Sequence, residues 1–164
     1  MSKFFVALLL ALGGSVLTSV ASIAWAADTE TVAEPTVKDR LDTARASIRA
    51  GDYKRALAEL NIAARSEPRN ADVHNLLGYA TRKQASPNVP KAIEHYQTAL
   101  RLDPSHKGAH EYIGEAYLMQ GNPAQAEKHL ADLARICGNT TCEEYADLAK
   151  AIGDFKAKPQ AKAL

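Results

Sequence analysis

Apolar side chains recur every three or four positions through most of this chain, the spacing that puts them on one face of an α-helix. Leu41 and Ile48 belong to the first such stripe, and the turn-forming residues 51–52 end it. The next stripe, over residues 53–65, stops before Pro68, because proline lacks the amide that a helix needs. The pattern predicts two helices joined by a short turn.

Two further helix pairs follow, and their markers keep a regular spacing. Markers of the first pair return 36 residues later, and those of the middle pair return after 34 or 36 residues. Ala56, Ala63 and Pro68 correspond to Ala92, Ala99 and Pro104 at a spacing of 36 residues. Leu77 and Gly78 correspond to Ile113 and Gly114 at the same spacing, and Ala92 corresponds to Ala126 at a spacing of 34. The underlying period is 34 residues, with two extra residues within 85–90 of the middle unit.

This arrangement resembles the tetratricopeptide repeat family, whose 34-residue units each hold two helices. The middle and last units match the family pattern through His74, Leu77, Gly78, Thr81, Ala92, Tyr96, Ala99 and Pro104, and through His110, Ile113, Gly114, Tyr117, Ala126, Leu130 and Leu133. The first unit has Ala44 and Ser47 where glycine and an aromatic residue are usual. The resemblance implies an all-α fold, an α-solenoid of three helix-turn-helix repeats at residues 37–70, 71–106 and 107–136, which binds a partner in its concave face.

Beyond Ile136 the repeat pattern fails, and a different kind of helix follows. Thr141 is a candidate hydroxyl cap, and the acidic residues after it suit a helix start. An apolar stripe that includes Tyr145 and Phe155 would cover the last repeat, as the end of a solenoid requires. We expect residues 137–155 to form a turn and a capping helix, and residues 156–164 a disordered tail.

The first 26 residues have the three parts of a secretory signal: one Lys, an apolar core and the small-x-small ending Ala24-Trp25-Ala26. We predict cleavage after Ala26, an acidic flexible leader over residues 27–36, and a periplasmic or secreted protein. The alternative is an inner-membrane anchor through residues 4–27, which are numerous enough to cross a bilayer about 30 Å thick.

The charge balance argues against a nucleic-acid partner. The chain has 20 Lys and Arg and 19 Asp and Glu, and loss of Lys3 with the signal would leave equal numbers. Phosphate binding needs an excess of basic residues on one face. The sequence also lacks the nucleophile-elbow, phosphate-loop and dinucleotide-binding motifs, so we predict neither an enzyme nor a bound cofactor.

Cys137 and Cys142 are the only cysteines, and export would bring them into an oxidising compartment. A disulfide is the favoured interpretation, and closure of so short a loop would add at most about 2–3 kcal/mol. The alternative is a redox or metal-handling accessory protein that uses this pair. The four intervening residues fit neither a CxxC redox motif nor a usual zinc knuckle.

His106 and His110 stand four residues apart and could chelate a metal from one helix face. His110, like His74, occupies the large-residue position of the repeat, and the sequence shows no third ligand. We therefore expect packing histidines and no metal site.

In a tetratricopeptide solenoid the first helix of each repeat lines the concave face, so the resemblance implies which residues form a groove. They are Arg45, Arg49, Asn75, Tyr79, Arg82, Glu111 and Glu115. We expect these side chains to face outward, basic towards the N-terminal half and acidic towards the C-terminal half, with Tyr79 and Asn75 as peptide anchors. The alternative is that they are solvated charges on helix faces.

The family's clamp for a C-terminal carboxylate uses Lys and Asn residues at set positions. The matching positions here hold Leu41, Arg45, Leu76, Gly108 and Tyr112, so we expect no such clamp. The function that the sequence favours is an exported adaptor or assembly factor that binds another, unidentified protein. Self-assembly through the solenoid ends or the protruding SPNVP loop, residues 86–90, is a further alternative.

Overall fold

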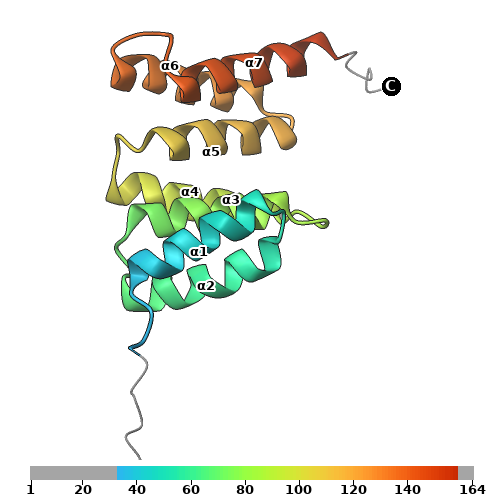
Figure 1. Cartoon of the computed structure of the whole chain (residues 1–164). Coiled ribbons are helices and arrows are strands. Elements are labelled where there is room, and N and C mark those ends of the chain that lie inside the picture. The colour runs from blue at the N-terminus through green and yellow to red at the C-terminus, as the bar shows by residue number, and fades with distance from the viewer. Residues whose placement is uncertain (1–32, 159–164) are drawn as a thin grey trace, which may run out of the picture. The chain divides into compact units, whose positions relative to one another are not determined.

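Three helix pairs and a seventh helix make up the computed structural model, which describes residues 33–158. The pairs are α1 (Val37–Arg49) with α2 (Tyr53–Ser66), α3 (Ala71–Lys83) with α4 (Val89–Leu102), and α5 (Lys107–Met119) with α6 (Pro123–Cys137); α7 (Glu143–Ala157) follows them. They stack in chain order (Figure 1). All lie in one unit, Glu34–Leu164, and the described residues contain no strand.

The helices that open each pair contact one another along the stack. α1 contacts α3, α3 contacts α5, and α5 contacts α7, whereas within the described residues α2, α4 and α6 make no comparable contacts among themselves. A stack whose first helices are closer together than its second helices must curve towards the first helices. We call the side formed by α1, α3, α5 and α7 the inner face.

Most helix starts have a local chemical cause, whereas α7 starts at Cys142 without a side-chain cap. The side chains of Asp52, Asn70, Asn88 and Asn122 each accept a hydrogen bond from the backbone amide three residues ahead, which satisfies an amide that the first helical turn leaves unpaired. Thr36 makes a full capping box with Asp39 at the start of α1. These caps fix where each repeat turns, and so fix the register of the side chains on the inner face.

Small residues allow the helices to approach closely. The core contains fully buried alanines from six of the helices, Ala44, Ala56, Ala63, Ala80, Ala92, Ala99, Ala109, Ala116 and Ala126. Two glycines are required by packing: a Cβ on Gly78 would come within 2.6 Å of the Tyr96 ring, and one on Gly114 within 2.7 Å of Leu148. The second contact seats α7 against α5, which completes the inner face at its C-terminal end.

Some boundaries differ from the sequence prediction. Val89 and Pro90, expected in a loop, are the first residues of α4, because proline suits the first helical turn. Residues 85–88 remain exposed in the connection, which projects beyond the ends of α3 and α4 (Figure 1). The predicted cap Thr141 instead donates its hydroxyl proton to Asn139, and Cys142 occupies the N-cap position of α7. α7 runs through Ala157, two residues beyond its predicted end.

The signal peptide, its cleavage site after Ala26, the alternative anchor over residues 4–27, most of the leader and residues 159–164 of the tail lie outside the described residues. Within residues 33–158, no helix has the length and apolar character needed to cross a membrane.

Candidate functional site

The predicted groove residues lie on the three helices of the inner face, where they link one repeat to the next. α1 supplies Arg45 and Arg49, α3 supplies Asn75, Tyr79 and Arg82, and α5 supplies Glu111 and Glu115. Their spacing of three, four or seven residues places each set on one side of its helix. What the helical spacing does not reveal is how deeply each side chain is buried.

Arg82 is the centre of a buried cluster between α3 and α5. Its Nη2 lies 2.5 Å from Glu115 Oε2, and its Nε donates a hydrogen bond to Tyr96 Oη at 3.3 Å. Its guanidinium carbon lies 5.6 Å from the ring centre of Tyr79 and 5.8 Å from that of Tyr112. The side chain is only 6% exposed, so the expectation that Arg82 faces outward is wrong: it joins two repeats, because α5 packs over it.

Of the tyrosines around Arg82, Tyr96 is fully buried, and Tyr79 and Tyr112 are half-buried. The rings of Tyr79 and Tyr112 are 4.8 Å apart, and Tyr112 also packs on Tyr96 at 6.2 Å. Removal from water raises the pKa of the Tyr79 and Tyr112 hydroxyls and brings that of Tyr96 to about 12. Tyr79 alone among them has Lys83 beside its ring, 5.7 Å from the centre, so it forms the outer edge of the cluster.

Asn75 is also buried rather than outward-facing. It is 6% exposed, and its Nδ2 sits 3.3 Å from where a Cβ on Gly108 would be. Its Oδ1 accepts no hydrogen bond from the described residues. A buried acceptor without a donor costs about 1–3 kcal/mol. Glycine at residue 108 leaves room for the Nδ2 end of this side chain, whereas its Oδ1 is enclosed without a donor.

The N-terminal half of the inner face is less basic than expected, because acidic residues neutralise it. Arg45 pairs with Asp72 at 3.0 Å and with Asp42 at 3.6 Å. The second oxygen of Asp72 lies 3.0 Å from Nε2 of His106. Arg49 is exposed, and no carboxylate among residues 33–158 lies within ion-pair distance of it. The Arg45–Asp72 pair joins α1 to α3, and the Asp72–His106 contact joins α3 to the start of α5. The paired charges largely cancel.

The C-terminal half carries carboxylates without cations. Glu111 is 8% exposed, and burial, then Glu115, Asp147 and Glu144, raise its pKa to about 8, against the opposing effect of Arg82. Within the described part of the chain, Glu111, Glu144 and Asp147 belong to no ion pair. We call these three residues the acidic patch. It draws on α5 and α7, so the helix predicted only to cap the solenoid also contributes charge to the inner face.

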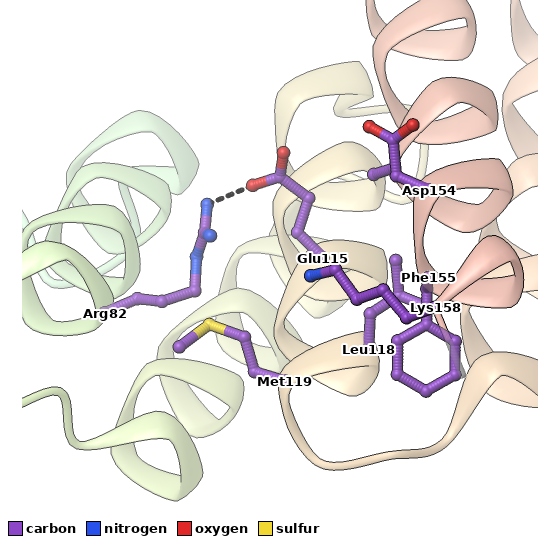
Figure 2. A pocket seen from close by; sticks show the side chains of 8 residues that line it. Arg82, Glu115, Leu118, Met119, Asp154, Phe155 and Lys158 are labelled. Atoms are coloured by element: carbon purple, nitrogen blue, oxygen red, sulfur yellow. Dashed lines mark ion pairs between the residues drawn. The ribbon is translucent and has the colours of Figure 1, made fainter. Parts of the chain in front are cut away.

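An apolar hollow adjoins the acidic patch further along α5 and α7. Figure 2 shows Leu118, Met119 and Phe155 in its lining, with Arg82, Glu115, Asp154 and Lys158 around them. Ala151 of α7 also lines the hollow. Met119 is 51% exposed and is the one large apolar side chain that the described residues leave open to solvent. The sequence analysis missed the α7 part of this site. A signal existed, since Leu148 follows Gly114 by 34 residues and α7 thus keeps the repeat register.

The cysteines and histidines lie away from the inner-face hollow. Cys137 and Cys142 are joined by a disulfide with their Cα atoms 6.3 Å apart, between α6 and α7. Both ring nitrogens of His106 have partners, since Nδ1 accepts from the amide of Ala109 at the start of α5 and Nε2 lies 3.0 Å from Asp72. His110 instead meets His129 and Asp132 of α6, two residues that the sequence analysis did not connect with it.

Comparison with known proteins agrees with this architecture. A family model described as "Tetratricopeptide repeat" matches residues 41–87 and 83–139, more than half of the chain. The Arabidopsis thaliana protein "TPR repeat-containing thioredoxin TTL4" is 30% identical over 102 residues, which are 62% of this chain and 14% of that protein. This chain thus corresponds to a small part of that relative.

Solved structures share the fold at low sequence identity. The Sgt2 TPR domain from Aspergillus fumigatus has a TM-score of 0.65 and 17% identity, covering 80% of this chain and 89% of its own. The second TPR domain of human RPAP3, solved with the HSP70 peptide SGPTIEEVD, has a TM-score of 0.63 and 17% identity, covering 74% and 96%. The expected fold, an α-solenoid of tetratricopeptide repeats, is confirmed, and this chain belongs to the tetratricopeptide repeat family.

Proposed function

We propose that this chain is a protein-interaction module, an exported adaptor or assembly factor that holds a segment of a partner protein against α5 and α7. The observation that carries the proposal is the exposed Met119 in an apolar hollow beside carboxylates that have no cation. A hollow of this kind takes one large apolar side chain, and the patch favours a Lys or Arg. The RPAP3 domain, which has a similar fold, was solved with the peptide SGPTIEEVD. This supports peptide binding by the fold, and the basic residue expected here follows from the acidic patch alone.

The geometry suggests the spacing of the two features in the partner. Glu111 and Met119 are separated by eight residues of α5, or about 12 Å at 1.5 Å per residue. An extended segment covers that distance in about four residues at roughly 3.3 Å each. We therefore expect a basic side chain about four positions from a large apolar one.

A display library of random peptides tests the proposal directly. Panning on the wild type should enrich peptides with the basic and apolar residues at this spacing. An enriched peptide should lose at least about tenfold in affinity for Met119→Glu, because the change puts a charge in the apolar hollow. Gln97→Glu, at an exposed position on α4, adds the same charge and should bind normally. No enrichment, or equal binding by Met119→Glu, would contradict the proposed site.

We propose export on the strength of residues 1–26, whose pattern is that of a secretory signal, together with the paired cysteines. Cell fractionation with N-terminal sequencing distinguishes the outcomes. A periplasmic or secreted chain that starts at Ala27 supports cleavage, whereas an intact chain in the membrane fraction supports the anchor. Free thiols on a cytosolic chain would contradict both export and the disulfide.

A further inference from the structure

A polar pair joins the two helices of every repeat at equivalent positions. In the last two repeats both members are histidines, His74 with His95 and His110 with His129. In the first repeat the same positions hold an ion pair, Arg40 with Glu59, at 2.9 Å. The last repeat differs from the others because a carboxylate lies beside its pair: Asp132 Oδ2 is 3.8 Å from Nδ1 of His110.

The hydrogen bonds of His110 decide which of its nitrogens can bind a ligand. Its Nε2 lies 3.0 Å from the carbonyl oxygen of Pro104. A carbonyl can only accept, so this nitrogen carries the proton. In the neutral ring Nδ1 therefore has a lone pair, and it points at Nδ1 of His129, 3.0 Å away. Fixing one histidine nitrogen by a backbone carbonyl, so that the other faces a metal, is the usual arrangement in metal sites.

We propose that His110, His129 and Asp132 bind a divalent transition-metal ion of the zinc type. One potential ligand atom from each of the three lies within 4.8 Å of the other two. Zinc–nitrogen bonds of about 2.0–2.1 Å in tetrahedral geometry separate two nitrogens by roughly 3.3 Å. The two rings would need to move apart by only a few tenths of an ångström. His129 would bind after its proton moves from Nδ1 to Nε2, with no net proton release.

The residues around the proposed metal site restrain its ligands and leave it open to solvent. The ring of Tyr117 stacks on that of His129 with 13° between their planes, which limits the rotation of the imidazole. His129 also borders an open depression lined by Gln97, Leu100, Arg101, Ile113 and Tyr117, from which water could complete the coordination. The other carboxylate oxygen of Asp132, Oδ1, forms an ion pair with Arg135. Arg135 is 75% exposed, and an exposed ion pair is weak enough to permit metal binding.

The preceding repeat supplies an internal control. The Nε2 of His74 is likewise held by a carbonyl, that of Pro68 at 2.9 Å. The position equivalent to Asp132 is Thr98, whose hydroxyl donates to the carbonyl of Glu94. The ring centres of His74 and His95 are 6.1 Å apart, against 5.2 Å for His110 and His129. In the His74–His95 pair, one histidine is thus held by a backbone carbonyl in the same way, but the pair has no carboxylate as third ligand and its rings are further apart.

Cobalt and zinc titrations of the untagged, chelator-stripped protein test the site. One equivalent of Co²⁺ should give the visible absorption of tetrahedral coordination, and Zn²⁺ should displace it. His129→Gln and Asp132→Asn should each weaken binding at least about tenfold. The matched control, His95→Gln in the preceding repeat, should bind as the wild type does. Zinc should also raise the thermal midpoint of the wild type more than that of Asp132→Asn.

Three outcomes would overturn the proposal: no saturable binding by the wild type, wild-type affinity in both Asp132→Asn and His129→Gln, or an equal loss in His95→Gln. Asp132 lies on the surface of α6, with 34% of its side chain exposed. Asp132→Asn should therefore fold even if His129→Gln disturbs the packing. Circular dichroism of both variants in the presence of a chelator checks that they are folded. The proposal is independent of the peptide site, because these ligands lie between α5 and α6 rather than on the inner face.

Discussion

The two halves of the inner face use charge in different ways. In the N-terminal half, Arg45 faces Asp72, and Asp72 in turn faces His106. In the C-terminal half, Glu111, Glu144 and Asp147 form no ion pair within the described residues. Arg82 and Glu115 mark the border, where the last ion pair of the series is also its most buried.

The difference separates charges that hold repeats together from charges that can recognise a ligand. A side chain already paired across two repeats loses that partner if it binds a peptide, which offsets the gain. An acidic side chain without an ion pair gains from a basic group that arrives, and for Glu111 that group would also favour the charged form over the protonated one. The half with the unpaired acidic residues is also the half with the exposed Met119, so two independent features support the proposed peptide site there.

Leu148→Ala should have the largest effect on this comparison, because it loosens α7 and with it half of the ligand site. Leu148 is fully buried against Gly114. Truncation of such a leucine costs about 3–5 kcal/mol through lost burial and the cavity left behind. Urea denaturation should show this loss, and selected peptides should bind poorly. If peptide binding survived with stability reduced, α7 would not form a wall of the site.

Arg82→Met should have the next largest effect and lower the free energy of unfolding by about 2–3 kcal/mol. This is somewhat less than the usual cost of breaking a buried ion pair, because Glu115 is still partly exposed to water. The variant leaves the carboxylate of Glu115 near the acidic patch without its cation. Adding Glu115→Gln should restore part of the stability. A double-mutant cycle in urea measures the coupling, and strictly additive losses would show that the two side chains do not interact.

The fold follows from the sequence because its causes are local. Apolar spacing marks each helix, and an Asp or Asn cap or a proline marks most ends. The 34-residue period then sets the order of stacking. Errors occur where two local signals compete, as at Pro90: the two prolines of residues 86–90 indicate a loop, whereas proline also suits the first turn of a helix.

The site is less predictable because it depends on distances between repeats. Helical spacing correctly places Arg82 and Glu111 on the first helices, but burial depends on how closely the next helix packs, which the sequence of one helix does not show. His129 lies 19 residues from His110, and only the packing of α6 on α5 brings them together. The recurrence of histidine pairs in two successive repeats was a usable signal.

The acidic patch predicts a pH dependence. The folded protein keeps a proton on Glu111 up to about pH 8, whereas the unfolded chain releases it near its ordinary pKa of 4.5. Unfolding therefore releases a proton between these values, and the free energy of unfolding falls as pH rises through the window. We expect the free energy of unfolding to fall by on the order of 1 kcal/mol across this pH range, since water screens part of the charge on Glu111.

Glu111→Gln should remove that contribution and be more stable than the wild type near pH 8. Urea denaturation in chelator at about pH 5 and pH 8 measures it. The charges that face Glu111, namely Glu115 on its own helix, Glu144 and Asp147 on α7 and Arg82 on α3, remain in the variant. Glu143→Gln, at the exposed start of α7, serves as control and should keep the wild-type slope. A wild type without any slope would mean that Glu111 is hydrated.

Arg45→Gln should have the smallest effect and so tests the other half of the comparison. Both members of its pair with Asp72 are substantially exposed, at 39% and 52%, and such pairs contribute about 0–1 kcal/mol. We expect a loss of that size in dilute buffer, a smaller one in about 1 M salt because of screening, and unchanged affinity for selected peptides. The control is Lys38→Gln, which removes a positive charge from the same helix without breaking a contact between repeats. A large loss of peptide affinity in Arg45→Gln alone would place the ligand on the N-terminal half and reverse the assignment, because it would show that a paired charge, rather than an unpaired one, meets the partner.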